Sequence, residues 1–301
     1  MGPQDEHRVA APSGVDSPLP QPFYGYVAQA AETSALELDL HHGFEVVIAL
    51  SGAQERRASD LVTTLTPGDV WFCGMLEPHS WRFVSGGGMM VAIEFVAEFI
   101  GEGLLDDVAW PTLFTAPPSQ RPRIESPRAR QTALAIGETL RAEFEGQARG
   151  WRSAARAELL RLLLLLARDW APSARAGDAG AVSPRDLQRV MPAMAHVAAE
   201  PGGRLSAAEA ASACGLSVAQ FNRIFRQVMN MSFHEFILRY RLAAAAKEVL
   251  TTDLSLEDIA AGGGFVDHSH LHRVFLRYYG CTPHQYRSLR GLRAQRTVAA
   301  P

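Results

Sequence analysis

The sequence LEDIAAGGGFVDHSHLHRVFLRYYGCTPHQYR, residues 256–287, contains two amphipathic helical patterns separated by a glycine-rich turn. Apolar residues recur at helical spacing until the three glycines at 262–264 stop the first pattern, and Asp267 can cap a second helix. The apolar stripe of that second helix comprises Leu271, Phe275 and Tyr279. This order predicts a helix-turn-helix, an arrangement found both in DNA-binding proteins and in ordinary helical packing.

A second segment, residues 205–229, has the same order of signals upstream. Ser206 with Glu209 and Ser217 with Gln220 each have the spacing of a capping box, in which a hydroxyl and an acid or amide satisfy the first backbone N–H groups of a helix. The buried stripe of the second helix is predicted to comprise Phe221, Phe225 and Val228. Two copies of this pattern indicate a DNA-binding function far more specifically than one copy does.

The segment between the two copies, residues 232–251, keeps a helical face without a helix breaker. A helix of this length spans roughly 30 Å. Because one turn of B-DNA has nearly the same length, such a connector can place two recognition helices in successive major grooves.

The composition is that of an ordinary globular chain of 301 residues, with 47% apolar and 20% charged residues, and it allows two domains. We expect no signal peptide and no membrane span, because the longest apolar run, residues 162–167, is too short. The three cysteines show no paired spacing. These features favour a location of the protein in the reducing cytoplasm.

The net charge of −3 conceals a difference between the two ends of the chain. From Arg185 to the end there are 14 Lys and Arg residues against 9 Asp and Glu residues, which leaves the preceding part with a net charge of −8. The basic excess therefore lies with the predicted helix-turn-helix units, as expected if only that part faces phosphates.

The N-terminal part, residues 22–96, consists of short apolar or alternating runs separated by turn signals at 51–52, 67–69 and 86–88. This pattern predicts an all-β sandwich or barrel. The predicted strands are 23–27, 35–40, 44–50, 61–65, 70–73, 81–84 and 89–95.

Two helices are predicted to follow, at 126–146 and 151–170. The run at 159–166 is apolar around most of the second helix, so that helix must be buried on two sides. One side can pack on the barrel and the other on a second copy of the chain, which would give a homodimer. Burial within a single subunit is the alternative.

The basic C-terminal part resembles AraC-type (AraC/XylS) transcriptional regulators over about residues 183–290. The matching positions are Leu205, Ser206, Gly215, Leu216, Ser217, Phe221, Arg223, Phe225, Arg241, Leu242, Ile259, Ala260, Gly264, Phe265, Asp267, Ser269, Arg273, Phe275, Gly280, Thr282, Pro283, Tyr286 and Arg287. The resemblance implies sequence-specific binding of double-stranded DNA. It implies base-facing or backbone-facing roles for Ala219, Asn222, Arg223, Arg226, His268, Ser269, His272 and Arg273.

Three positions depart from the usual pattern of that family. Ala219 is small where a larger side chain is frequent, and His270 stands where an aromatic or apolar residue is common. Asn230 replaces a glycine, and asparagine tolerates the left-handed conformation that the turn requires. His268 and His272 are four residues apart, a spacing that can chelate zinc, but no third ligand is evident and we favour DNA contact.

The N-terminal part is similar to the cupins, whose fold is a small jelly-roll barrel. Residues 39–45 followed by Gly52 match the spacing of the first cupin motif, and 67–69 with His79 match the second. In metal-binding cupins the corresponding positions hold a divalent ion, and here they are Asp39, His41, Glu45 and His79. Because Asp39 replaces a histidine, we expect no metal and no cofactor, and we interpret the histidines as structural residues or as contacts to an organic ligand.

A small-molecule effector is therefore expected in the barrel. The candidate effector-binding residues are His41, His42, Glu45, Trp71, His79 and Trp81. The aromatic residues suit either a pocket or a packed core, and the sequence does not separate these alternatives.

The predicted fold is α+β and multidomain, with a cupin-like barrel and dimerisation helices followed by an all-α domain with two helix-turn-helix units. The predicted divisions are a disordered tail at 1–21, a sensor domain at 22–170, a linker at 171–183, a DNA-binding domain at 184–290 and a tail at 291–301.

The predicted function is a non-enzymatic, cytoplasmic transcription regulator that acts as a dimer, with RNA polymerase as a further partner if it is an activator and with no membrane partner. A metal-dependent cupin enzyme is one alternative. An effector-free regulator whose barrel only dimerises is the other.

Overall fold

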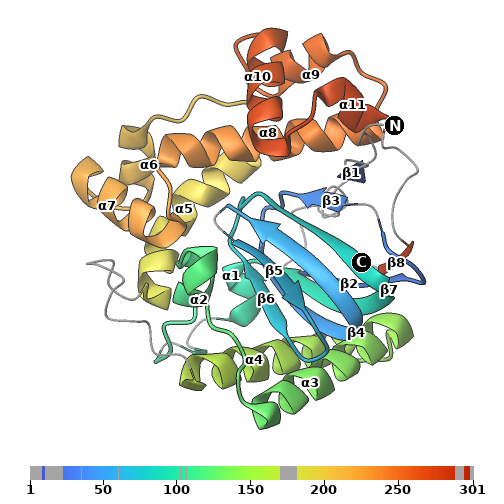
Figure 1. Ribbon diagram of the computed structural model, residues 1–301. Helices are drawn as coiled ribbons and strands as arrows, with labels where there is room; N and C mark the ends of the chain where they lie inside the picture. Colours follow the sequence, from blue (N-terminus) through green and yellow to red (C-terminus); the bar gives the residue numbers. More distant parts are fainter. Residues whose placement is uncertain are drawn as a thin grey trace.

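The computed structural model describes residues 9–10, 23–34, 36–59, 61–101, 104–105, 107–169, 182–288 and 295–298 (Figure 1). Most of the predicted N-terminal tail and of the predicted linker lies outside the described residues. The predicted C-terminal tail contains one described strand. The described chain forms a curled sheet with helices on one face and a purely helical unit above one end of the sheet (Figure 1).

Within the described residues the sheet has eight strands, and their pairing is antiparallel except for β1 with β3. β4 pairs with β5, β6 and β7, and β7 pairs further with β2 and β3. This confirms the all-β prediction for residues 22–96. The strands are β1 (Val9–Ala10), β2 (Phe23–Ala30), β3 (Leu36–Asp39), β4 (Phe44–Ala58), β5 (Leu61–Leu65), β6 (Val70–Cys73), β7 (His79–Phe95) and β8 (Gln295–Val298).

The glycine signals at 51–52 and 86–88 do not end strands, contrary to the sequence-based expectation. β4 continues through Gly52, and β7 continues through Gly86 and Gly87. The predicted strands 81–84 and 89–95 are therefore parts of the single strand β7. Register shifts between β4 and β7 occur at Ala49/Ser51 and at Gly52/Ala53. Because these glycines adopt positive φ, they form a bulge that curls the sheet instead of interrupting it.

Alternation along the strands divides the side chains between two faces. On β4, Phe44, Val46 and Ile48 pack toward the helices, and the intervening residues face the concave interior of the sheet. The interior contains a second apolar cluster that includes Trp71 and Trp81. The sheet therefore separates a large helix-facing core from a smaller interior with polar residues.

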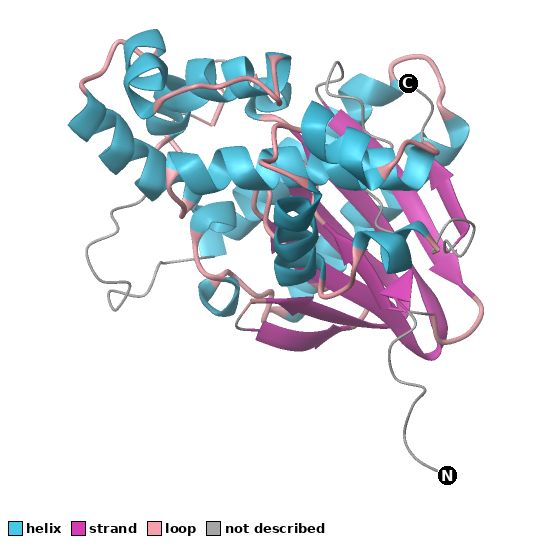
Figure 2. Ribbon diagram, turned by 90° about the horizontal axis from the view of Figure 1, so that it is seen from above, coloured by secondary structure: helices cyan, strands magenta, loops and turns pink. Residues whose placement is uncertain are grey.

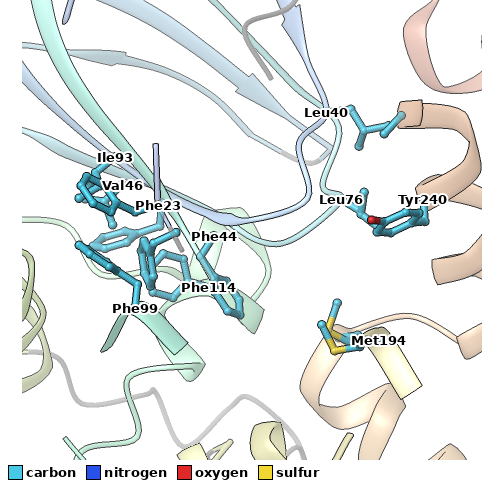
Figure 3. Close-up of a cluster of buried hydrophobic side chains, with 14 of the residues drawn as sticks. Phe23, Leu40, Phe44, Val46, Leu76, Ile93, Phe99, Phe114, Met194 and Tyr240 are labelled. Carbon is cyan, nitrogen blue, oxygen red and sulfur yellow. The ribbon is translucent and has the colours of Figure 1, made fainter. Parts of the chain in front are cut away.

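The helix-facing side is covered by α1 (Ala97–Ile100), α2 (Thr112–Thr115), the 3-10 turn η2 (Pro118–Gln120), α3 (Pro127–Gly146) and α4 (Trp151–Asp169). Figure 3 shows Phe99 and Phe114 against Phe23 and Phe44 of the strands. A Cβ atom at Gly25 would lie 2.3 Å from the ring of Phe144, so α3 needs glycine there to reach the sheet.

The C-terminal unit contains α5 (Pro184–Ala199), α6 (Ala207–Ala213), α7 (Val218–Met229), α8 (Phe233–Thr251), α9 (Leu256–Gly262), α10 (His268–Tyr279) and α11 (Pro283–Arg287). The predicted caps Ser206, Ser217 and Asp267 accept backbone N–H groups as expected. Asn230 has φ 52°, in the left-handed region. In the view from above, these helices lie over the strands at one end of the sheet (Figure 2).

No helix within the described residues combines the length and the apolar character needed to cross a membrane.

Candidate functional site

The first predicted recognition helix, α7, exposes its predicted contact residues. Ser217 and Gln220 form the reciprocal capping box that starts the helix. Its apolar stripe, including Phe221 and Phe225, is buried and packs against Phe233 of α8. The opposite face is exposed and contains Ala219, Asn222, Arg223 and Arg226.

The second predicted recognition helix, α10, repeats this arrangement. Asp267 caps it by accepting the N–H of His270, and Leu271 and Phe275 are buried. His268, Ser269 and Arg273 are exposed and His272 is partly exposed. The ring centroids of His268 and His272 are 6.3 Å apart.

The connector α8 is continuous over 19 residues, which corresponds to about 28 Å. Arg241 on α8 donates hydrogen bonds to the carbonyl oxygens of Pro201, Gly203 and Gly264 at 2.9, 2.7 and 3.1 Å. Gly264 lies in the turn of the second helix-turn-helix. One arginine therefore fixes that turn to the loop that precedes α6.

A second candidate site lies in the concave interior of the sheet, around Glu45. In the strand register Glu45 is opposite Cys73 of β6 on one side and opposite Glu94 of β7 on the other. His79 begins β7 and is opposite Asp39 of β3. All of these side chains are buried.

Backbone carbonyls orient both buried histidines. His41 Nδ1 lies 2.9 Å from the carbonyl oxygen of Gly43, and His79 Nδ1 lies 3.0 Å from that of Glu77. The Nε2 atoms of His41 and His79 lie 3.8 and 3.4 Å from Glu45 Oε2. The sheet therefore brings together three of the six predicted effector residues, His41, Glu45 and His79.

The interior cluster shifts the pKa values of its members. Burial opposes ionisation of Glu45, but His41 and His79 outweigh burial and hold the pKa of Glu45 well below its usual range. Burial likewise opposes charge on His41, but Glu94, Cys73 and Glu45 outweigh it and raise the pKa of His41. Burial, reinforced by Asp39 and Glu45, raises the pKa of Glu94 to about 7.

Residues that the sequence analysis did not select complete the cluster. Tyr26 donates a hydrogen bond to Glu45 Oε1 at 3.0 Å. The buried Arg56 places Nη1 4.0 Å from Glu45 Oε2, and its guanidinium carbon lies 5.3 Å from the centroid of Trp81. Alternation places Glu94 on the face opposite Phe95, but only the strand register shows that it meets Glu45.

The other predicted effector residues have different surroundings. His42 packs on Tyr240 of α8, with ring centroids 4.2 Å apart. Trp71 and Trp81 are buried in the interior apolar cluster. Trp71 also lines a surface groove with Arg121 and Arg130.

The loops next to the buried histidines contact the helical unit directly. Leu76 donates its N–H to the carbonyl oxygen of His41 at 2.9 Å, and its own carbonyl accepts a hydrogen bond from Arg239 of α8 at 3.0 Å. Arg239 also pairs with Glu235, which accepts a hydrogen bond from Tyr278 of α10. A chain of polar contacts thus runs from the loop of His41 to α10, the second predicted recognition helix.

Comparison with known proteins matches residues 210–288 to a helix-turn-helix domain family. The regulatory protein SoxS from Salmonella typhimurium is 38% identical over 73 residues, which are 24% of this chain and 68% of SoxS. The transcriptional activator RhaR from Mannheimia succiniciproducens is 36% identical over 73 residues, but these are only 26% of its length and 24% of this chain. The chain thus spans about a quarter of that relative.

The overall fold is similar to that of ToxT from Vibrio cholerae. One ToxT structure matches with a TM-score of 0.59 at 10% identity, covering 90% of this chain and 100% of ToxT. Another, bound to an unsaturated fatty acid, matches with a TM-score of 0.58 at 12% identity, covering 91% and 97%. At this identity the likeness shows the fold alone.

Fold and sequence together define a two-unit helix-turn-helix protein with an N-terminal sheet. The chain belongs to the AraC-type family of transcriptional regulators.

Proposed function

We propose that this chain is a sequence-specific DNA-binding transcription regulator controlled by an effector in the interior of its N-terminal sheet. The observation that carries this proposal is that the predicted contact residues on α7 and α10 are exposed, with His272 partly exposed, and that the continuous helix α8 lies between the two units. The proposed division is a sensor part at 22–170 and a DNA-binding part at 184–290, joined by the linker at 171–183.

The exposed side chains suit readout of a major groove. Arg223 and Arg273 can each donate two hydrogen bonds to a guanine edge, and Asn222 can pair with adenine. Ala219 can contact only a thymine methyl, and Arg226 faces the phosphate backbone. In this proposal His268, Ser269 and His272 complete the second reading face.

Control by an effector requires contacts that differ between two arrangements of the protein. The contacts of Leu76 with Arg239 and of His42 with Tyr240 join the sheet to α8. A change at His41 would alter both contacts, because His42 follows it and Leu76 bonds to its carbonyl. The fatty-acid-bound ToxT structure supports control of this fold by a small ligand.

The surface of α4 and the names of the relatives support two further partners, a second copy of the chain and RNA polymerase. Leu160, Leu164 and Leu165 of α4 stay partly exposed, which supports a homodimer through this helix. Relatives named as activators support activation and contact with RNA polymerase. The three free cysteines support a location in the cytoplasm.

Selection of genomic fragments by the purified full-length protein tests the function. We expect a specific fragment whose affinity falls by about 100-fold or more in the Arg223→Ala/Arg273→Ala double variant, because each arginine–guanine pair contributes about 1–3 kcal/mol. Arg128→Ala, an exposed arginine on α3, is the matched control and should bind normally. Equal binding by wild type and double variant would overturn the assignment.

A further inference from the structure

The interior of the sheet concentrates ligand atoms that make no hydrogen bond within the described part of the chain. They are His41 Nε2, Glu45 Oε2, His79 Nε2 and Glu94 Oε1. Their side chains are between 0% and 3% exposed, so water does not satisfy them at the surface. Buried polar atoms nearly always form a hydrogen bond, and four atoms without one in the same place indicate a further partner beside the ion pairs of Glu45 with the two histidines.

The two histidines are oriented as ligands. Nδ1 of each ring lies against a backbone carbonyl, and that of His79 also lies 3.0 Å from Cys73 Sγ. In the neutral tautomer that donates to the carbonyl, Nδ1 carries the proton and the Nε2 lone pair faces the cluster. This is the usual arrangement of histidines that bind metals, in which a backbone carbonyl fixes the ring and its tautomer.

The two carboxylates lie where a cation would stabilise the charged form of both. Glu45 and Glu94 are directly opposite each other on adjacent strands, where two like charges repel. Asp39, Glu45 and His79 form one set of ligand atoms that lie within 4.8 Å of one another, and His41, Glu45 and Glu94 form another. Arg56 approaches Glu45 Oε2 only to 4.0 Å, so it does not replace a directly bound cation.

We propose that His41, Glu45, His79 and Glu94 hold one divalent first-row transition-metal ion, such as Zn²⁺ or Fe²⁺, in the interior of the sheet. Imidazole nitrogens combined with carboxylate oxygens suit these borderline ions. The incomplete cupin motif favoured no metal, but the sheet adds Glu94, which lies outside both motifs.

The separations agree with such a site. Ligand atoms at about 2.0–2.2 Å from a tetrahedral ion lie about 3.3 Å from each other. Glu45 Oε2 lies 3.4 Å from His79 Nε2 and 3.8 Å from His41 Nε2. Small side-chain shifts therefore suffice to bring these three atoms to an ion, and the Glu94 ligand atom lies within 4.8 Å of those of His41 and Glu45.

This inference assigns a metal ion to the proposed effector site. Only the idea that the metal regulates DNA binding rests on the proposed function. Metal binding is measured without DNA. A failure to bind metal would leave the DNA-binding proposal standing, and a failure to bind DNA would leave the metal site standing.

The test uses full-length protein stripped with a chelator, dialysed against Zn²⁺ and analysed for bound zinc. We expect one zinc per chain in the wild type and well below one in Glu45→Gln and Glu94→Gln. The matched control is the His268→Gln/His272→Gln double variant, which removes the exposed pair with chelating spacing on α10 and should keep one zinc.

Thermal unfolding gives a second readout for the same proteins. At free zinc about 100 times the dissociation constant, the midpoint of the wild type should rise by roughly 5 °C or more, and the rise should vanish in both Glu variants. Circular dichroism shows whether each variant is folded. If Glu45→Gln does not fold, the zinc content of Glu94→Gln tests the proposal. Stoichiometric zinc in either folded Glu variant, no zinc in the wild type, or loss of zinc in the control would overturn the proposal.

Discussion

The two candidate sites place their functional side chains in opposite environments. On α7 and α10 the proposed contact residues are exposed, His272 only partly, and the apolar stripe beneath them is buried, so changing them should leave the fold intact. In the sheet interior, Glu45 and Arg56 are 0% exposed and form part of the packing. Function and stability are therefore separable in the helical unit and inseparable in the sheet.

The largest effect that this comparison predicts is at the centre of the sheet. Glu45→Ala should lower the free energy of unfolding by about 3–5 kcal/mol, because it leaves Arg56 and two histidines buried without their shared carboxylate. Denaturant unfolding in the presence of a chelator measures this. Glu158→Ala on α4, whose carboxylate pairs with the exposed Arg161, is the control and should cost below about 1 kcal/mol. Equal costs at the two positions would contradict the contrast.

A smaller effect is expected where the two regions meet. Arg239→Ala removes a charged hydrogen bond to Leu76 and the pair with Glu235, a loss of about 1.5–3 kcal/mol. The variant should still bind its DNA fragment but respond less to effector, which affinity measurements with and without effector would show. A full response would mean that the signal does not pass through this contact.

These regions also differ in how much the sequence predicted. The helical caps and stripes follow from residues three or four apart, so Ser217, Asp267 and the exposed face of α10 were located from the chain itself. The Glu45–Glu94 pair joins residues on two strands whose register depends on a bulge near Gly52. Alternation fixes the face of each residue but not its neighbour across the sheet.

Some predictions therefore remained incomplete. The sequence placed His41 and His42 together, but consecutive residues of the loop before β4 point to different partners. His41 faces Glu45, and His42 faces Tyr240 of α8. The aromatic residues Trp71 and Trp81 proved to be part of the interior apolar cluster. Burial in three dimensions, which no local pattern encodes, decided these cases.

A moderate loss of stability is expected at the start of the first recognition helix. Ser217→Ala removes the side-chain oxygen that accepts the N–H of Gln220 and should cost about 1 kcal/mol. Denaturant unfolding detects it, and Ser217→Asp, which restores a capping acceptor, should recover most of the loss. A loss that aspartate does not recover would mean that the cap is not the cause.

The smallest expected effect concerns Arg226, which we assign to the phosphate backbone. Arg226→Ala should weaken binding similarly on specific and non-specific DNA and reduce the salt slope of binding by about one, whereas Arg223→Ala should reduce specificity. Titrations at several salt concentrations on both DNAs distinguish the two arginines. A loss of specificity in Arg226→Ala would assign it to a base instead.

The central claim is that α7 and α10 read DNA as two units fixed by α8. Hydroxyl-radical footprinting of the selected fragment tests it most directly. We predict two protected segments per chain on one face of the duplex, about 10–10.5 base pairs apart, with Arg223→Ala weakening one segment and Arg273→Ala the other. A single protected segment that both variants weaken equally would contradict the claim.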